Sequence, residues 1–441
     1  MKNIENAVRK HEKLILDAER YIWKNPETGY REKKTGTYLE EQFEMLGYKL
    51  NKAGNIPGFT ATVDTGREGP TVLILGELDS IICPTHPEAD PETGAVHSCG
   101  HNAQCATLLG IAAAIREDGV LDTLSGRIML AAVPAEELLE IGYRSELRAS
   151  GVIKYFGGKS EFLHRGMFDG VDLALMVHTA SSYCVRDGSV GCITKRVLYK
   201  GKAAHAGGSP WNGRNALYAA NCGLNAVNAI RETFEEKDLI RVHPIITHGG
   251  DMVNAIPETV ELESYIRGAS FDAIYRANKK VDRALIGAAV SLGVNIEIID
   301  NPGYSPLVNS SDLIELVKEA AAIAMPDEKF DHHTCYSTGS TDMGDLSAIM
   351  PAVHPYAAGA VGTSHGNDYY VSDPERACVK NAIWQITMLT LLLQNGAERA
   401  KSVIEGFTPA FTKEEFLAYQ DSLARCGDRI RYTDGEATLI F

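Results

Sequence analysis

The segment "TVLILGELDS" (71–80) joins an uninterrupted apolar run to two carboxylates. A short continuous run of this kind is typical of a strand that is buried on both faces of a parallel sheet. The segments "GRIMLAAVPAEE" (126–137) and "DLALMVHTASS" (172–182) repeat the pattern, and "HNAQCATLLGIAAAIRE" (101–117) has a helical composition. Strands that alternate with helices predict an α/β fold with a mostly parallel central sheet and helices on its faces.

The predicted strands end in chemically active side chains. Asp79, Glu136, Glu137 and His178 all fall at the carboxyl end of a predicted strand. In open α/β sheets, ligands bind beyond the carboxyl ends of the strands. We therefore expect a functional site at that edge of the sheet.

Residues 190–305 have a different pattern, in which strands alternate between apolar and polar residues. Segments of helical periodicity separate these strands, which gives the order β-α-β-β-α-β and predicts a small α+β domain with an antiparallel sheet. Because helix–strand alternation resumes afterwards, we expect an insertion that divides a larger domain into residues 1–189 and 306–441. A helix and an edge strand are expected to form an appendage at the end of the chain.

The composition argues against several classes of partner. The formal net charge of −15 disfavours binding to nucleic acid or to an anionic membrane surface. No apolar run reaches the roughly 18 residues of a membrane span, and the first residues lack the apolar core of a signal peptide. The nine cysteines are scattered without a C-x-x-C pair, as in reduced cytosolic proteins. We therefore expect a cytoplasmic protein with a small-molecule substrate.

Two short motifs could carry chemistry, but neither is decisive alone. Cys99 and His101 offer a thiolate and an imidazole, which are ligands for zinc and similar metals. A buried cysteine beside a helix-terminal histidine would give the same letters, and this is the commoner case. The neighbours Glu136 and Glu137 suit a division of labour between a metal ligand and a proton carrier. Paired glutamates are also common on helix surfaces.

Seven motifs, taken together, give the chain a resemblance to a known family. In chain order they are "HSCGHNAQ", "PAEE", "MVH", "GKAAHAGGSPWNGRNAL", "NAIPETVELESYIRG", "GSTDMGDLS" and "GTSHGNDYYV". The set resembles the aminoacylase/carboxypeptidase family of dinuclear metallohydrolases, and within it the branch of N-acyl-amino-acid amidohydrolases and aminobenzoyl-glutamate hydrolases. The resemblance implies a zinc-exopeptidase-like fold, in which residues 190–305 form a lid and dimerisation domain of a homodimer.

The resemblance also implies a metal centre with two divalent ions per chain, zinc or manganese. Its protein ligands would be Cys99, His101, Glu137, His178 and His365. Cys99 would bridge the ions, and Glu136 would be the general base. Asp79 matches an acid that orients a ligand histidine, a partner that metal-bound imidazoles generally need.

The inserted domain would supply the remaining site residues. His205 matches a lid histidine that stabilises the oxyanion and that often reaches into the partner's site in dimers. Asn254 and Arg267 match residues that hold the carboxylate or carbonyl of the substrate, and the arginine fork suits a carboxylate. Ser340, in "GSTDMGD", would line the pocket. If the motifs did not follow the family's order along the chain, each of these residues would fit an ordinary surface position.

The chain departs from the family pattern at three places. The usual "CGHDxH" reads "CGHNAQ", so that Asn102 and Gln104 replace an acid and a histidine. "ELDSII" stands where "DMDALP" is usual, and an extra segment between "PAEE" and "MVH" predicts a helix beside the pocket. Neither Asn102 nor Gln104 stands at a usual ligand position, and the three departures together concern the substrate more than the chemistry.

The resemblance implies a metal-dependent amidohydrolase that cleaves the amide bond of an N-acyl amino acid or a related conjugate. A metallo-exopeptidase or dipeptidase would use the same centre, and it would differ only on the acyl side of the pocket. A non-catalytic metal-binding subunit is the third hypothesis. The general base and all five ligands are present, and a site that had lost its activity should lack at least one of them.

Overall fold

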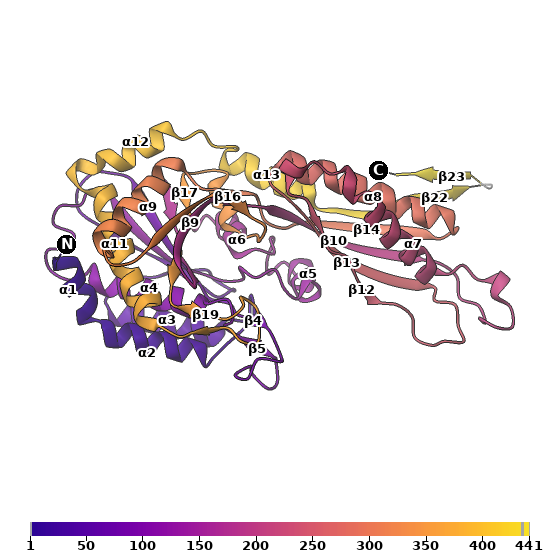
Figure 1. Ribbon diagram of the computed structural model, residues 1–441, viewed down its shortest axis with the longest axis horizontal. Coiled ribbons are helices and arrows are strands. Elements are labelled where there is room, and N and C mark those ends of the chain that lie inside the picture. Colours follow the sequence, from indigo (N-terminus) through magenta and orange to yellow (C-terminus); the bar gives the residue numbers. More distant parts are fainter. Residues whose placement is uncertain (1, 434–435, 441) are drawn as a thin grey trace. The chain divides into compact units, whose positions relative to one another are not determined.

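The computed structural model describes residues 2–433 and 436–440 of the chain (Figure 1). The chain folds into two compact units. The first unit consists of Met1–Gly188, Leu307–Tyr336 and Thr341–Lys413, and the second of Ser189–Pro306, Ser337–Ser340 and Glu414–Phe441.

The C-terminal segment corrects the expected division of the chain. We expected residues 306–441 to belong to the first domain, but Glu414 and the residues after it group with the second unit. The reason is strand β21 (Arg425–Asp428), which pairs antiparallel with β14 (Asn295–Pro302) and extends the sheet of that unit. Such pairing satisfies backbone groups that would otherwise form an open sheet edge.

The central sheet of the first unit has six strands. Their order is β1 (Asn51–Lys52), β2 (Phe59–Asp64), β6 (Arg127–Val133), β3 (Thr71–Glu77), β7 (Leu173–Leu175) and β17 (Ala352–Val353). The four strands from β6 to β17 are parallel, whereas β1 and β2 form an antiparallel edge. Every residue of β3 is buried, as its continuous apolar run predicts. The mostly parallel sheet expected from the sequence is confirmed.

Ten α-helices belong to this unit among the described residues. They are α1 (Lys2–Lys10), α2 (Glu12–Trp23), α3 (Lys33–Met45), α4 (His101–Ala114), α5 (Ile141–Ala149), α6 (Gly158–His164), α9 (Ser311–Ala324), α10 (Met343–Ser347), α11 (Asn381–Leu393) and α12 (Glu398–Gly406). Helix α4 is buried along its whole length. Its small residues permit this close packing, since a Cβ on Gly110 would lie 2.6 Å from the Ile15 side chain of α2.

A second, smaller sheet continues the functional edge of the first unit. It contains β15 (Leu307–Val308), β9 (Tyr183–Ser189), β18 (Tyr356–Ala358) and β8 (His178–Ala180), with β16 (Phe330–Ser337) paired to β9. Strand β8 begins at His178 and runs parallel to β18, where Tyr356 is its partner. His178 is therefore held by a strand rather than by a free loop.

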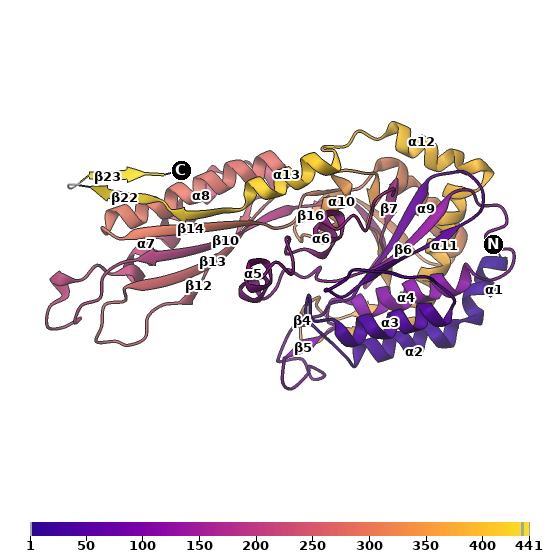
Figure 2. The same cartoon turned by 180° about the vertical axis from the view of Figure 1, so that it is seen from behind.

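The second unit is an antiparallel sheet with two helices on one face (Figures 1 and 2). Its elements are β10 (Gly191–Lys200), α7 (Ala216–Ala229), β11 (Arg241–Val242), β12 (Ile245–His248), β13 (Thr259–Gly268), α8 (Phe271–Ser291), β14 and β21. The helices bury one face of β10, β13 and β14 in an apolar core that includes Val197, Leu262 and Ile298. This arrangement is the α+β insertion expected from the sequence.

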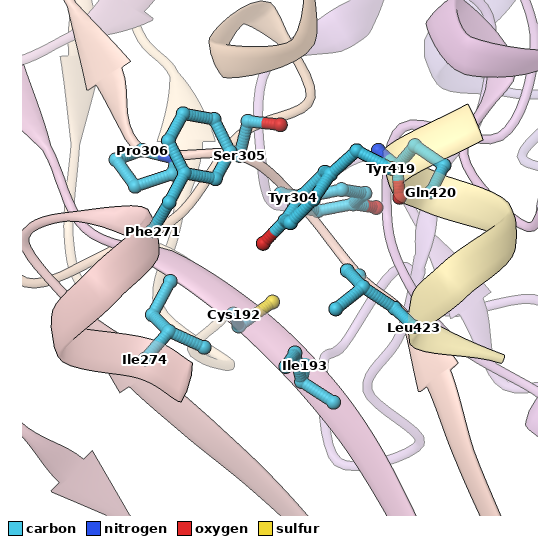
Figure 3. A pocket seen from close by; sticks show the side chains of 11 residues that line it. Cys192, Ile193, Phe271, Ile274, Tyr304, Ser305, Pro306, Tyr419, Gln420 and Leu423 are labelled. Atoms are coloured by element: carbon cyan, nitrogen blue, oxygen red, sulfur yellow. The ribbon is translucent and has the colours of Figure 1, made fainter. Parts of the chain in front are cut away.

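Helix α13 (Lys413–Leu423) attaches the C-terminal segment to the second unit. Figure 3 shows Tyr419, Gln420 and Leu423 of this helix facing a small apolar pocket beside the start of β10. The ring of Tyr419 packs edge-on against Phe271, with ring centres 5.1 Å apart. Beyond β21, the strands β22 (Ile430–Thr433) and β23 (Glu436–Leu439) form a two-stranded antiparallel sheet.

In the part of the chain that the structure describes, no helix is both long and apolar enough to cross a membrane. All nine cysteines are free thiols.

Candidate metal centre

The carboxyl ends of β3, β6 and β7 meet at one edge of the central sheet, because these strands are parallel. Asp79 follows β3, Glu136 and Glu137 follow β6, and His178 follows β7. The structure thus places these four predicted residues at the same edge. Glu136 is 7% exposed and Glu137 is 9% exposed, so both carboxylates are nearly removed from solvent.

Cys99 and His101 reach this edge through a tight turn at the start of α4. Gly100 has a φ of 91°, in the left-handed region, and a Cβ there would lie 2.4 Å from the hydroxyl of Tyr369. Only glycine suits both requirements. The turn therefore places the thiol and the imidazole side by side, as the "CGH" motif predicts.

Five side chains form two donor clusters that share Cys99. One cluster consists of Cys99, His101 and His178, and the other of Cys99, Glu137 and His365. The Cys99 Sγ lies 3.4 Å from Nε2 of His178 and 3.3 Å from Nε2 of His365. Nε2 of His365 lies 2.9 Å from a carboxylate oxygen of Glu137. A thiolate shared by two clusters is suited to bridge two cations.

Asp79 connects the two clusters without belonging to either. Its Oδ1 lies 3.2 Å from Nδ1 of His101, and its Oδ2 accepts a 2.7 Å hydrogen bond from the backbone N–H of Glu137. The carbonyl of Asp79 lies 2.9 Å from the same Nδ1. These contacts leave Nε2 of His101 for a metal, as the orienting role expected of Asp79 would require.

Acidic side chains are concentrated in this buried region. Five carboxyl groups are at least nine-tenths buried, namely Glu77, Asp79, Glu136, Glu137 and Asp342, and the side chains of Lys159 and Arg144 are buried beside them. Burying so many ionisable groups is costly unless each is paired or binds a metal. Imidazole, thiolate and carboxylate are suitable donors for divalent cations. The residues therefore fit a dinuclear metal centre.

The pKa values show protons where cations would bind. Hydrogen bonds to Cys99 and Glu137 raise the pKa of His365 to about 11. Burial and then Glu137 raise the pKa of the Cys99 thiol, but His101 and His178 outweigh them and bring it to about 6. Burial and the charges of Glu77 and Glu137 raise the pKa of Glu136 well above its ordinary value. Protonated imidazoles and a thiolate form a site that metal ions can enter by displacing protons.

Sequence reasoning missed Glu77, Lys159 and Asp342. Glu77 Oε1 accepts a 2.5 Å hydrogen bond from Nζ of Lys159, and the same ammonium contacts Asp342. Burial opposes ionisation of Glu77, but Lys159 lowers the pKa of that carboxyl to about 2. Lys159 lies on α6, within the extra segment where we expected a helix, and no signal in the sequence linked it to the site.

Asn102 and Gln104, the departures from the family pattern, both point into the protein. Nδ2 of Asn102 donates a 2.7 Å hydrogen bond to Oε1 of Glu19 on α2, and both side chains are buried. Oε1 of Gln104 accepts from the backbone N–H of Glu77 at 3.3 Å. An acid at position 102 would face the Glu19 carboxylate in a buried contact. The asparagine at position 102 instead donates a hydrogen bond to Glu19, which avoids that repulsion.

This pair predicts a pH-dependent stability. Burial raises the pKa of Glu19 to about 7, from an ordinary 4.5. The stabilisation from the protonated carboxyl is fully present below pH 4.5, and it is lost as the pH rises through about 7. Relative to Glu19→Gln, the wild type should lose about 2–3 kcal/mol of unfolding free energy between about pH 5 and pH 8, measured by urea denaturation. The control is Asp17→Asn, since Asp17 is an exposed acid on α2, and it should keep the wild-type pH dependence. If the unfolding free energy of Glu19→Gln fell with pH as steeply as that of the wild type, the prediction would be wrong.

In the second unit, His205 and Asn254 are exposed and lie on adjacent segments. An isolated bridge pairs His205 with Ala255, and the backbone N–H of Ala206 donates to the carbonyl of Asn254 at 2.9 Å. Nδ1 of His205 accepts from the backbone N–H groups of Gly207 and Gly208, at 3.1 and 2.9 Å. The ring is therefore held by its Nδ1 side.

Arg267 and Ser340 also meet within the second unit. Nη1 of Arg267, near the end of β13, donates a 2.8 Å hydrogen bond to Oγ of Ser340. Both side chains are half-buried. The structure thus pairs the residue that we expected to bind a carboxylate with the serine that we expected in the pocket.

Comparisons with known proteins identify the family. Residues 73–386 match the family described as "Peptidase family M20/M25/M40". The Xaa-Arg dipeptidase of Mus musculus is 28% identical over 346 residues, which is 76% of this chain and 74% of the relative. The N-acetyl-L-cysteine deacetylase of Bacillus subtilis is 27% identical over 329 residues, or 70% and 72% of the two chains. A dinuclear metal-binding peptidase of the M20 family from Bacillus subtilis has the same fold, with a TM-score of 0.65, 18% identity, and coverage of 87% of this chain and 99% of that one.

The family match extends from β3 to α11 and covers most of the chain. It includes all five predicted ligands, from Cys99 to His365, and the intervening insertion. The family expected from the seven motifs is confirmed. The chain belongs to peptidase family M20/M25/M40 and is a metal-dependent hydrolase that acts on amide bonds.

Proposed function

We propose that this enzyme releases an amino acid from an N-acyl amino acid or a related conjugate, with Glu136 as the general base. The observation that carries the proposal is the pair of donor clusters that share Cys99. Beside them stands a buried glutamate, Glu136, that neither of these two clusters uses. A separate carboxylate next to a metal centre is what water activation requires.

In the proposed mechanism, two divalent ions would be held by Cys99, His101, Glu137, His178 and His365. When bound, such ions supply Lewis-acid polarisation of the amide carbonyl and lower the pKa of water. Glu136 accepts the proton of the attacking water and later donates it to the leaving amine nitrogen. Burial of Glu136 excludes competing solvent from this proton transfer.

His205 is proposed to stabilise the oxyanion of the tetrahedral intermediate. Since Nδ1 accepts two backbone hydrogen bonds, the ring proton of the neutral imidazole must lie on Nε2. A donor at Nε2, oriented by the backbone, is the group that a developing oxyanion needs. This tautomer supports the role that the resemblance implies.

Asn254 and Arg267 are proposed to bind the substrate's carboxylate, with Ser340 holding the arginine in place. Loss of a charged hydrogen bond costs about 1.5–3 kcal/mol. Arg267→Met should therefore raise KM for N-acyl amino acids by about 10–100-fold and change kcat less. Amides that lack the α-carboxylate should not be affected. Arg241→Met, an exposed residue opposite Arg267 in the strand register, is the matched control and should behave as wild type.

We further propose zinc or manganese as the metal, a homodimer, and a cytoplasmic location. Free thiols support a reducing compartment. Exposed apolar side chains of the second unit support a protein partner there, and they include Trp211, Tyr218, Met252 and Val253. Analytical ultracentrifugation of the wild type and of Trp211→Glu would test the dimer.

A dipeptidase activity is the second candidate, and the similarity to an Xaa-Arg dipeptidase favours it. One screen separates the two. Metal-free enzyme, reloaded with manganese or zinc, is assayed on N-acyl amino acids, aminobenzoyl-glutamate and dipeptides that share the same C-terminal amino acid. We expect the highest kcat/KM on an acyl conjugate. Higher kcat/KM on dipeptides would support the second candidate, and no hydrolysis of any amide would contradict both.

A further inference from the structure

Glu77 ends strand β3 with a carboxylate that is fully buried. Its two oxygens have different surroundings. Oε1 accepts from Lys159, whereas Oε2 has no hydrogen-bond partner among the described residues. Oε2 instead lies 3.2 Å from Nε2 of His101, the atom that we assign to the metal. An unpartnered buried oxygen directed at a ligand nitrogen requires an explanation.

The other nitrogen of His101 shows which species faces Glu77. Nδ1 lies 2.9 Å from the carbonyl oxygen of Asp79, which can only accept, so Nδ1 carries a proton. In the neutral form of the ring, which is the form that binds a metal, Nε2 then presents a lone pair to the lone pairs of Glu77. Two acceptors at this separation repel unless a proton or a metal ion lies between them.

The separation fits two donors of one ion. Donors about 2.1 Å from an ion, with an angle of about 90–110° between them, lie about 3.0–3.4 Å apart. Glu136 Oε2 is farther from the same nitrogen, at 4.0 Å. Glu77, His101 and Glu136 form a third donor cluster that does not include Cys99. Glu77 therefore approaches His101 from the Glu136 side.

Lys159 fixes this carboxylate in place. Its ammonium, fully buried on α6, contacts both Glu77 and Asp342. The backbone N–H of Lys159 also donates to Oδ2 of Asp342 at 3.0 Å. With Oε1 bound to Lys159, the carboxylate of Glu77 cannot rotate away from His101 without breaking a buried ion pair.

We propose that Glu77 is a sixth protein donor of the metal centre, on the His101 side, and that Lys159 is the positioning residue that holds it there. The inference rests on the proposed function, since it adds to that metal centre. An added carboxylate would give the ion on the His101 side four protein donors, so that a bound water would raise its coordination number above four, and it supplies a hard oxygen. Both changes favour manganese over zinc at this position.

Metal binding without substrate tests the proposal. Metal-free wild type is titrated with MnCl2 and, separately, ZnCl2 by calorimetry, and bound metal is counted by elemental analysis. The wild type should bind two Mn²⁺ per chain. Glu77→Gln should bind one with little change and the second at least about tenfold more weakly, with a smaller loss for Zn²⁺. Electron paramagnetic resonance should show a coupled manganese pair only in the wild type.

Two further variants keep the test decisive. Glu77→Asp retains the charge for Lys159 but shortens the side chain, so it should also weaken the second Mn²⁺ by at least about tenfold. Asp342→Asn removes the other partner of Lys159 and should retain both ions within about threefold. Unchanged Mn²⁺ binding in either Glu77 variant would overturn the proposal, as would an equal loss in Asp342→Asn. A wild type that binds less than one ion would instead overturn the proposed function and this inference with it.

Discussion

Replacement of Glu136 by Gln should lower kcat by at least about 10³-fold while the protein retains both metal ions. Glutamine is nearly isosteric, but it cannot accept the proton of the attacking water. Because neither cluster that shares Cys99 includes Glu136, the ligands themselves stay in place. Steady-state kinetics on the best acyl substrate and elemental analysis of the same preparation give the two quantities to compare.

The matched control is Glu146→Gln, an exposed acid on α5 a few residues after "PAEE". It should have wild-type kcat and metal content. Near-normal activity in Glu136→Gln would remove Glu136 from the mechanism. A loss of metal together with activity would assign it to the ligands instead. The pH–rate profile gives an independent check. Its acidic limb reports ionisation of the general base, so this limb should be absent from the residual activity of Glu136→Gln.

The sheet edge that carries the site could be predicted from the sequence, because its signal is local. Asp79, Glu137 and His178 each follow an apolar strand closely, and parallel strands have their carboxyl ends on one side. The alternating pattern of 190–305 likewise identified the inserted sheet. His365 has no such signal, since it lies in a loop with a φ of 64°, and only the family order identified it.

The missed residues depend on contacts between distant parts of the chain. Lys159 stands on a short helix, and its ion pairs with Glu77 and Asp342 span 82 and 183 residues. Similarly, β21 joins the second unit through pairing with β14, more than a hundred residues earlier. No periodicity within one segment reports such pairings. Glu77 had a weak signal, because it precedes Asp79 in "GELDS" and could have been weighed as a second acid at the sheet edge.

Replacement of Cys99 by Ala should remove both metal ions, and this sets it apart from replacement of any other ligand. Cys99 is the residue common to the two clusters that contain the five predicted ligands, whereas His178 and His365 each belong to one of those two. We therefore expect Cys99→Ala to weaken both binding steps by more than about 100-fold, because even residues behind the ligands are worth 10–100-fold. Activity should fall at least as far as in Glu136→Gln.

A comparison with a variant of a ligand that belongs to one cluster tests whether Cys99 serves both ions. After gel filtration in metal-free buffer, the wild type should retain two ions, His178→Ala about one, and Cys99→Ala fewer than one. Cys378→Ala is the matched control, since this thiol is also fully buried and belongs to none of the donor clusters. It should retain two ions and lose only the stability expected for a small cavity. If Cys99→Ala retained one ion as firmly as His178→Ala does, the thiolate would serve a single ion, and the shared-bridge geometry would be wrong.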